Sequence, residues 1–187
     1  MDPRALIFDC DGTLADTMPA HYRAWLDVLR PHGISFPEER FYALAGTPTK
    51  EIVRILAAEE GKIVDALAVV KIKEEAFLEQ IAEVVPISHI VDIARAARGL
   101  HPMAVASGGQ RRIVERTLQQ IGILDWFGAV VTAEDTVRHK PDPDLFLEAA
   151  RRLGVPPEIC TVYEDADLGI EAARRAGMRW VDVRIPR

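Results

Sequence analysis

Short runs of apolar residues alternate along this chain with longer segments in which apolar residues recur every three or four positions. The short runs predict buried β-strands, and the periodic segments predict amphipathic α-helices. Because the two kinds of segment alternate, we expect an α/β fold: a doubly wound, Rossmann-like parallel sheet with helices on both faces. The strands that the pattern predicts are 5–8, 103–106, 129–132, 161–163 and 180–183.

Residues 16–85 do not follow this alternation. Apolar residues at helical spacing in 22–29, 52–56 and 63–84 predict three or four helices, and no convincing strand lies among them. The simplest organisation is a small α-helical domain, 16–85, inserted after the first strand, with a hinge near each of its ends. The α/β core would then consist of residues 1–15 and 86–187.

Composition narrows the class of protein. With 187 residues, of which 49% are apolar, the chain can bury the core of a globular domain. No apolar run approaches the ~20 residues that cross a bilayer, and the N-terminus has no signal-peptide pattern. A net charge of −6 disfavours a nucleic-acid partner. With only two cysteines, Cys10 and Cys160, the expected location is the cytoplasm.

The first predicted strand is followed at once by two carboxylates, Asp9 and Asp11, and then by Gly12. Residues two apart in an extended segment point to the same side, so both carboxylates can face one small volume. Carboxylates that close repel each other unless a cation lies between them. A solvated turn is the alternative interpretation, because Asp and Gly are common in turns.

Residues suited to phosphate chemistry also follow the other predicted strands. Ser107 and Gly108 follow the second strand, Lys140 lies in the loop after the third, and Glu164 and Asp165 follow the fourth. In an open parallel sheet, ligands bind at the carboxyl ends of the strands, so this set predicts a Mg²⁺ site beside a phosphate site. Helix N-capping is the alternative for Ser107 and for the Glu164-Asp165 pair.

In their order along the chain, these segments resemble the signature of the haloacid dehalogenase-like superfamily. The resemblance covers nearly the whole chain, and its first and last segments are specific on their own. The helical insertion is similar in position to the cap of the β-phosphoglucomutase-like branch, and the small size resembles bacterial phosphatases of fructose 1-phosphate or 6-phosphogluconate. The matching segments are Asp9-x-Asp11-Gly12-Thr13-Leu14, Ser107-Gly108, Lys140-Pro141 and the segment that runs from Glu164-Asp165 to Gly177-Met178.

The resemblance implies a role for each matching residue. Asp9 would be the nucleophile that forms an aspartyl-phosphate, and Asp11 would serve as general acid and then as general base. Asp11 could instead only coordinate the metal. Ser107 and Lys140 would hold the phosphoryl oxygens. The cofactor would be Mg²⁺, and its ligands would be Asp9, Asp11 (through its backbone carbonyl), Asp165 and Glu164.

Five further residues are candidates for substrate contact. Gly12 and Thr13 would add turn geometry and a backbone donor, and Gly108 lies beside Ser107. His21 stands on the first helix of the insertion, where the mutase branch also has a histidine, and a structural histidine is the alternative. Lys50 could bind the substrate from the cap.

Together these features predict a monomeric, Mg²⁺-dependent phosphatase that acts on a small phosphorylated metabolite of the sugar phosphate type, with no nucleic-acid or membrane partner. The first alternative is a hexose-phosphate mutase. In that branch an arginine of a Gly-x-Ser-Arg segment grips a second phosphate, and the corresponding segment here, 46–50, has no arginine and ends in Lys50. Lysine lacks the planar guanidinium fork, which favours hydrolysis. The second alternative is a non-catalytic phosphate- or metal-binding module.

Overall fold

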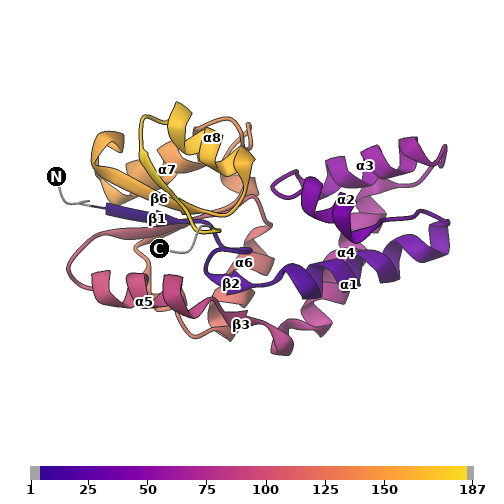
Figure 1. Ribbon diagram of the computed structural model, residues 1–187, viewed down its shortest axis with the longest axis horizontal. Helices are drawn as coiled ribbons and strands as arrows, with labels where there is room; N and C mark the ends of the chain where they lie inside the picture. Colours follow the sequence, from indigo (N-terminus) through magenta and orange to yellow (C-terminus); the bar gives the residue numbers. More distant parts are fainter. Residues whose placement is uncertain (1–4, 185–187) are drawn as a thin grey trace.

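The computed structural model describes residues 5–184, in which five parallel strands form one sheet in the order β5–β4–β1–β6–β7 (Figure 1). The chain starts at the central strand, moves out to one edge and then crosses to the other, which confirms the doubly wound prediction. The strands are β1 (Ala5–Phe8), β4 (Met103–Ala106), β5 (Ala129–Val131), β6 (Cys160–Glu164) and β7 (Arg179–Asp182).

The predicted strands are found, but three of them have different boundaries. β6 is one residue longer at each end than predicted, and β7 lies one residue earlier. β5 ends before Thr132, although the prediction included it. The physical reason is local: the Thr132 N–H donates to the Asp135 carboxylate at 2.8 Å, and Thr132 thereby caps a short 3₁₀ helix instead of extending the strand.

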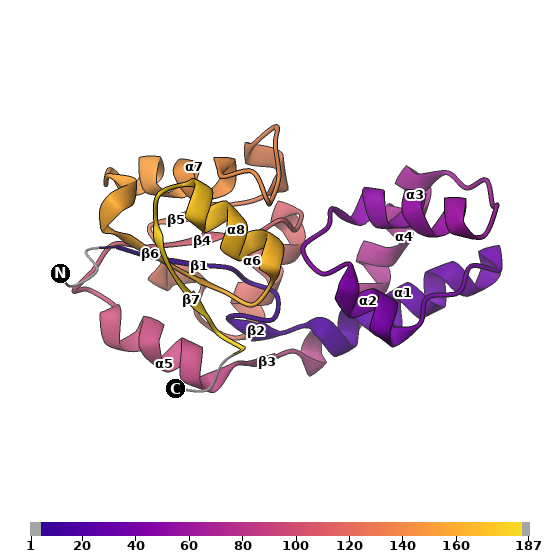
Figure 2. The same ribbon diagram turned by 45° about the horizontal axis from the view of Figure 1, so that its top comes forward.

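Helices cover both faces of the sheet (Figure 2). Successive side chains of a strand point to opposite faces, so Ile7 packs on one side and Phe8 on the other. The face of Ile7 packs against α7 (Asp144–Leu153) and α8 (Asp167–Arg175), and the face of Phe8 packs against α5 (Ser88–Ala97) and α6 (Arg111–Gln120).

The remaining helices form a separate unit beside the sheet, with an apolar core of its own. This unit contains α1 (Met18–Leu29), α2 (Glu38–Ala43), α3 (Thr49–Glu59) and α4 (Ala66–Glu79). The sequence pattern did not predict α2, because six residues are too few to show a helical period. Short 3₁₀ helices lie at Arg30–His32, Ile81–Glu83, Leu124–Trp126, Ala133–Asp135 and Pro157–Ile159.

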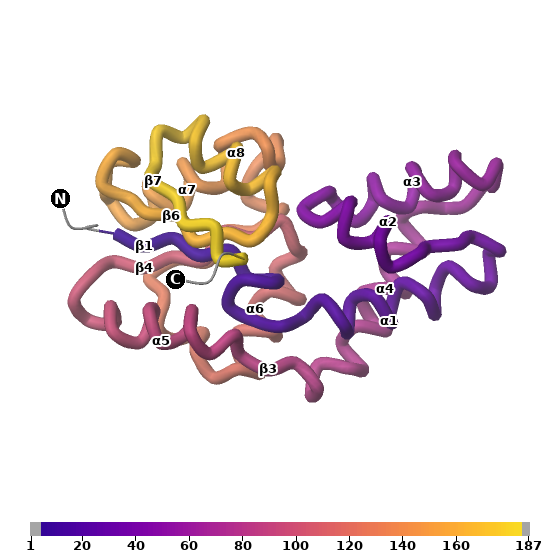
Figure 3. The backbone as a smooth tube through the Cα atoms, in the orientation of Figure 1, coloured from indigo at the N-terminus to yellow at the C-terminus, as the bar shows by residue number. Residues whose placement is uncertain are grey.

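The chain passes between the two units twice, and the two passages run side by side (Figure 3). They pair as short antiparallel strands, β2 (Ala15–Asp16) and β3 (Val85–Pro86). The prediction found no strand at these ends, because two residues carry no readable alternation. Beside them Phe77, Val84 and Ile113 belong to one buried cluster, which joins the helical unit to α6. Among residues 5–184, no helix is both long and apolar enough to cross a membrane.

Two leucines of α7 test how this helix packs. Leu145 is 0% exposed in the core between α7 and the sheet, whereas Leu147 is 39% exposed on the outer side of the same helix. We expect Leu145→Ala to lower the free energy of unfolding by about 2–5 kcal/mol, because it removes buried methyl groups and leaves a cavity. The matched variant Leu147→Ala should cost less than about 1 kcal/mol. Urea denaturation measures both, and equal losses would contradict this packing.

Candidate active site

The loop after β1 places two aspartates at the carboxyl edge of the sheet. Asp9 still pairs with β6, because its N–H donates to the carbonyl of Tyr163 at 3.0 Å. The chain then turns tightly: the N–H groups of Leu14 and Ala15 both donate to the carbonyl of Cys10 at 3.0 Å. Cys10 itself is buried in the apolar cluster with Phe8. Asp9 and Asp11, on either side of it, line the cavity instead.

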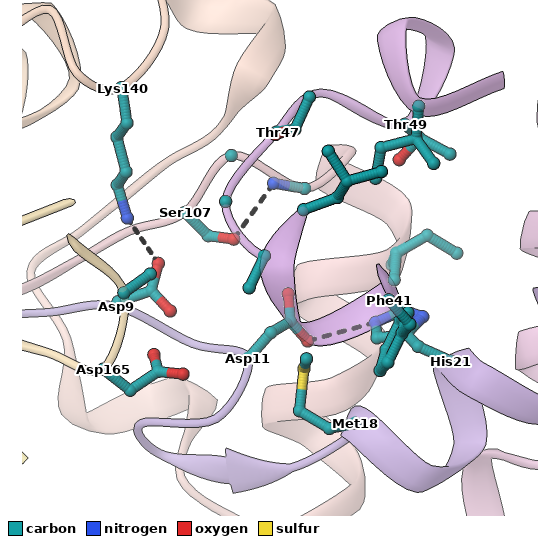
Figure 4. Close-up of a pocket in the computed structure, with 18 of the residues that line it drawn as sticks. Asp9, Asp11, Met18, His21, Phe41, Thr47, Thr49, Ser107, Lys140 and Asp165 are labelled. Carbon is teal, nitrogen blue, oxygen red and sulfur yellow. Dashed lines mark hydrogen bonds and ion pairs between the residues drawn. The ribbon is translucent and has the colours of Figure 1, made fainter. Parts of the chain in front are cut away.

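Lys140 connects the carboxyl ends of β1 and β6. Figure 4 shows its contact with Asp9. Its Nζ donates to Oδ1 of Asp9 at 2.6 Å and to Oε2 of Glu164 at 2.7 Å. All three side chains are buried, so these charge-assisted bonds lie in a region of low dielectric constant. Burial by itself would lower the pKa of Lys140, but the two carboxylates raise it above its usual value. Lys140 is therefore a permanent cation at this site.

One cation does not balance the carboxylates gathered here. Burial and then the charge of Glu164 raise the pKa of Asp9 well above its usual range, although Lys140 opposes this. The same two causes raise the pKa of Asp165 to about 7. Three carboxylates thus share one buried lysine, and the surplus negative charge favours binding of a further cation.

The donor set fits Mg²⁺. Carboxylate oxygens of Asp9, Glu164 and Asp165 lie within 4.8 Å of one another, and hard oxygen ligands are the ones that Mg²⁺ takes. Thr13 orients Asp165, because its hydroxyl donates to Oδ1 at 3.0 Å. Glu164 is already engaged: Oε2 accepts from Lys140, and Oε1 accepts from the N–H groups of Asp165 and Ala166. Asp9 and Asp165 therefore have the freer oxygens.

The residues that follow β4 offer groups that could bind a phosphate. Ser107 is buried and its Oγ accepts from the Gly109 N–H at 3.0 Å, while both residues and Gly108 line the cavity. Helix α6 begins after Gln110 with no side-chain cap, so Ser107 does not cap it. The capping alternative also fails for Glu164 and Asp165, because α8 starts after Ala166 without a side-chain cap.

A chain of polar contacts links Asp11 to the helical unit. Oδ1 of Asp11 accepts from the Thr17 hydroxyl at 2.8 Å and faces Nε2 of His21 at 3.3 Å. Nδ1 of His21 lies 2.9 Å from Nζ of Lys73, on α4. A protonated lysine can only donate, so Nδ1 accepts and Nε2–H donates to Asp11. This arrangement requires one tautomer of a neutral imidazole.

The ionisation tendencies agree with that assignment. Burial and then the charge of Lys73 lower the pKa of His21, which favours the neutral ring. Burial alone would raise the pKa of Asp11, but the hydrogen bonds from His21 and Thr17 lower it below its usual value. Asp11 is therefore held as a carboxylate by two donors on Oδ1.

The cavity between the sheet and the helical unit encloses about 890 Å³ of empty space, part of it open to solvent. The structure brings eight of the eleven predicted residues to its wall. It does not bring Gly12, Thr13 or Lys50 there: the first two hold the loop and Asp165, and Lys50 is exposed on α3. The eight residues that line the cavity are Asp9, Asp11, His21, Ser107, Gly108, Lys140, Glu164 and Asp165.

Sequence reasoning missed three residues of the site: Thr17, Lys73 and Glu74. Lys73 and Glu74 are 3% and 7% exposed and lie on the buried face of α4 together with Val70 and Phe77. A charged pair on the apolar stripe of a helix is the signal that could have found them, because charged residues are rarely fully buried without a function or a partner. Thr17 gave no such signal.

Comparisons with known proteins agree with this geometry. Residues 3–177 match the family of haloacid dehalogenase-like hydrolases. The chain belongs to this family. It is 42% identical over 180 residues to fructose-1-phosphate phosphatase YqaB of Escherichia coli (strain K12), covering 96% of each chain. It is 31% identical over 187 residues to the beta-phosphoglucomutase of Bacillus subtilis (strain 168), covering 96% of this chain and 83% of that one.

The fold of this haloacid dehalogenase-like hydrolase is also found among solved structures. The crystal structure of beta-phosphoglucomutase from Clostridium difficile superposes with a TM-score of 0.86 at 26% sequence identity, over 96% of this chain and 83% of that one. The similarity includes the helical unit, since the superposition extends over nearly the whole chain.

Two glycines of the haloacid dehalogenase-like signature are fixed by close approach of the site carboxylates. Gly12 has a φ of +80°, and a Cβ there would lie 2.3 Å from Oδ2 of Asp165. A Cβ on Gly169, in α8, would lie 2.0 Å from Oε2 of Glu164. Glu164 cannot move freely, because Lys140 and two N–H groups hold it. Both positions therefore require glycine.

Gly169→Ala tests this constraint. Helix propensity alone would stabilise the variant by up to about 1 kcal/mol, but the clash with Glu164 should instead lower the free energy of unfolding by about 1–3 kcal/mol. The control is Gly128→Ala, whose Cβ would meet nothing closer than Leu153 at 3.4 Å, so its effect should stay within about 1 kcal/mol. Chemical denaturation compares the two. A more stable Gly169→Ala protein would show that Glu164 can yield.

Proposed function

We propose that this chain is a Mg²⁺-dependent phosphatase that hydrolyses small sugar phosphates, of the fructose 1-phosphate or 6-phosphogluconate type, through an aspartyl-phosphate on Asp9. The observation that carries the proposal is the bridge from Lys140 to Asp9, at 2.6 Å, beside Ser107 and the surplus carboxylates. The 42% identity to a fructose-1-phosphate phosphatase supports the same substrate class. A monomeric state and a cytoplasmic location belong to this proposal, and both cysteines are free and buried.

The first step is attack on phosphorus. An oxygen of Asp9 forms the new P–O bond while the bond to the sugar oxygen breaks, and its electron pair leaves with that oxygen. Lys140 holds Asp9 in position and, with Ser107 and the Gly108–Gly109 loop, offers donors to the phosphoryl oxygens. Bound Mg²⁺, held by Asp9 and Asp165 with Glu164 nearby, would reduce the repulsion between the carboxylates and the phosphate.

Proton transfer falls to Asp11. Its Oδ1 is held by Thr17 and His21, whereas a Cβ on Gly109 would lie 3.6 Å from Oδ2, which places Oδ2 at the Ser107 side of the cavity. Asp11, which this structure holds as a carboxylate, must first take up a proton. It then gives that proton to the leaving sugar oxygen and later takes one from the water that attacks the phosphoryl-enzyme. The contact chain through His21 to Lys73 provides a route by which a proton reaches Asp11 from the helical unit.

The helical unit, proposed as the cap 16–85, supplies His21 and Lys73 and closes the cavity opposite the sheet. Because His21 and Lys73 belong to the cap, the ionisation of Asp11 depends on the position of the cap. Closure would also exclude water from the phosphoryl group until the sugar has left the site.

A mutase is the second candidate function. The observation in its favour is the similarity to the beta-phosphoglucomutases of Bacillus subtilis and Clostridium difficile. A mutase must bind the second phosphate of a bisphosphate. Lys50, the residue that the sequence offers for this, is exposed and does not line the cavity. Hydrolysis therefore fits the site better.

Asp9→Asn tests the nucleophile. The amide keeps the shape of the side chain but cannot attack phosphorus, so we expect kcat to fall by at least about a thousandfold. The fold should stay intact, because Lys140 keeps its contact with Glu164 and a carboxyl with a raised pKa is removed. Steady-state kinetics and thermal melting measure the two effects. Near-native turnover would refute the assignment.

Product analysis tests phosphatase against mutase. The protein is incubated with fructose 1-phosphate, 6-phosphogluconate and β-glucose 1-phosphate, with Mg²⁺ or with a chelator. We expect stoichiometric inorganic phosphate that disappears with the chelator, since the carboxylate cluster needs a cation. Isomerised sugar phosphate without phosphate release would establish the mutase instead, and release that persists in chelator would exclude the metal.

A further inference from the structure

Glu74 is a buried carboxylate that the proposed reaction does not use. It lies on the inner side of α4, its residue is 7% exposed, and it lines the cavity. Oε1 has one long contact, 3.4 Å, with Nζ of Lys73. Oε2 is buried and has no hydrogen-bond partner among the described residues. Such an atom is rare and costly in a folded protein, and a ligand group is one way to satisfy it.

Lys73 does not fully satisfy this carboxylate. Its Nζ is closer to His21, at 2.9 Å, than to Glu74, and it also lies 5.4 Å from the centre of the Trp25 ring. The lysine is therefore directed toward the proton route to Asp11. Oε2 of Glu74 therefore keeps unused hydrogen-bonding capacity, in a residue that lines the cavity.

The position of Glu74 relates it to the body of the substrate. The phosphoryl group is expected between Asp9, Ser107 and Lys140 at the sheet edge, so the rest of the molecule must extend toward the cap. There the wall contains apolar side chains, including Phe41 and Ile52, and two threonines, Thr47 and Thr49. An ionised carboxylate can only accept hydrogen bonds, so its partner in the ligand must be a donor. Sugar hydroxyls can donate.

The charges at the cap end also limit the substrate. In the described part of the chain, the ionisable groups that the cap contributes to the wall are His21, Lys73 and Glu74. His21 and Lys73 contact each other, and Lys50 is exposed elsewhere. A second anionic group at this end would meet the Glu74 carboxylate with no unengaged cation to balance it.

We propose that Glu74 is a specificity-determining residue: it accepts a hydrogen bond from a hydroxyl of the substrate body and disfavours a second anionic group there. The substrate class is then the neutral ketose or polyol monophosphates, in preference to aldonate phosphates and bisphosphates. This inference rests on the proposed phosphatase function and narrows it.

Kinetics with three substrates test the proposal. Fructose 1-phosphate has a neutral hydroxylated body, 6-phosphogluconate has a carboxylate at the far end, and p-nitrophenyl phosphate has no hydroxyl. Glu74→Leu should lower kcat/KM for fructose 1-phosphate by about 10- to 100-fold, because a charge-assisted hydrogen bond is lost, and leave p-nitrophenyl phosphate within about threefold. Glu74→Gln keeps an acceptor without the charge, so it should raise the ratio of 6-phosphogluconate to fructose 1-phosphate about tenfold.

Glu79→Gln is the matched control. It makes the same charge change on the same helix at an exposed position, and it should alter none of the three substrates. Equal losses on fructose 1-phosphate and p-nitrophenyl phosphate would overturn the proposal, because Glu74 would then act on the common chemistry through Lys73. An unchanged preference in both Glu74 variants would overturn it too.

Failure of the proposed function has a different signature. If the wild-type protein turned over none of the three compounds, calorimetry with fructose 1-phosphate in Mg²⁺ would replace the rates. Binding that weakens about tenfold or more in Glu74→Leu, but not in Glu79→Gln, would still support the hydroxyl contact. Binding that does not change in Glu74→Leu would refute it.

Discussion

The buried bridge from Lys140 to Asp9 and Glu164 is the interaction on which the rest of the site depends. It gathers residues from three separate strand ends at one edge of the parallel sheet, at 2.6 and 2.7 Å. Burying charges is costly, so a lone lysine or a lone carboxylate could not stay here. The same crowding fixes Gly12 and Gly169, where a Cβ would collide with a carboxylate, and leaves excess negative charge for a cation.

The chemistry is divided between the two units of the fold. The sheet edge carries the proposed nucleophile and phosphate donors, whereas Asp11, the proposed acid–base residue, is tied through His21 to Lys73 on α4. His21 stacks on Phe77 with ring centres 3.9 Å apart, and Phe77 belongs to the apolar cluster that joins the helical unit to α6. Packing at the junction thereby positions the ring that holds Asp11.

In the proposed mechanism, the group that attacks phosphorus and the groups that bind phosphate stand at the sheet edge. Related proteins with the same family signature include both a phosphatase and a mutase, so the sheet edge alone does not fix the substrate. The cap wall instead combines apolar side chains, hydroxyls and the carboxylate of Glu74, whose Oε2 has no hydrogen-bond partner among the described residues. We therefore expect differences among substrates to depend on a few side chains of the inserted helices.

The alternating fold, the inserted helices and the residues at the strand ends can be read from the sequence, because hydrophobic period and strand-end position are local properties. Strand-end position alone points to Asp9, Asp11, Ser107, Lys140 and Asp165. Only the tertiary structure decided that Glu164 holds Lys140, that Thr13 orients Asp165 and that Lys50 stands outside the cavity. It alone placed Lys73 and Glu74 at the site, because the contact between Lys73 on α4 and His21 on α1 joins residues more than fifty positions apart, and no local pattern encodes such a contact.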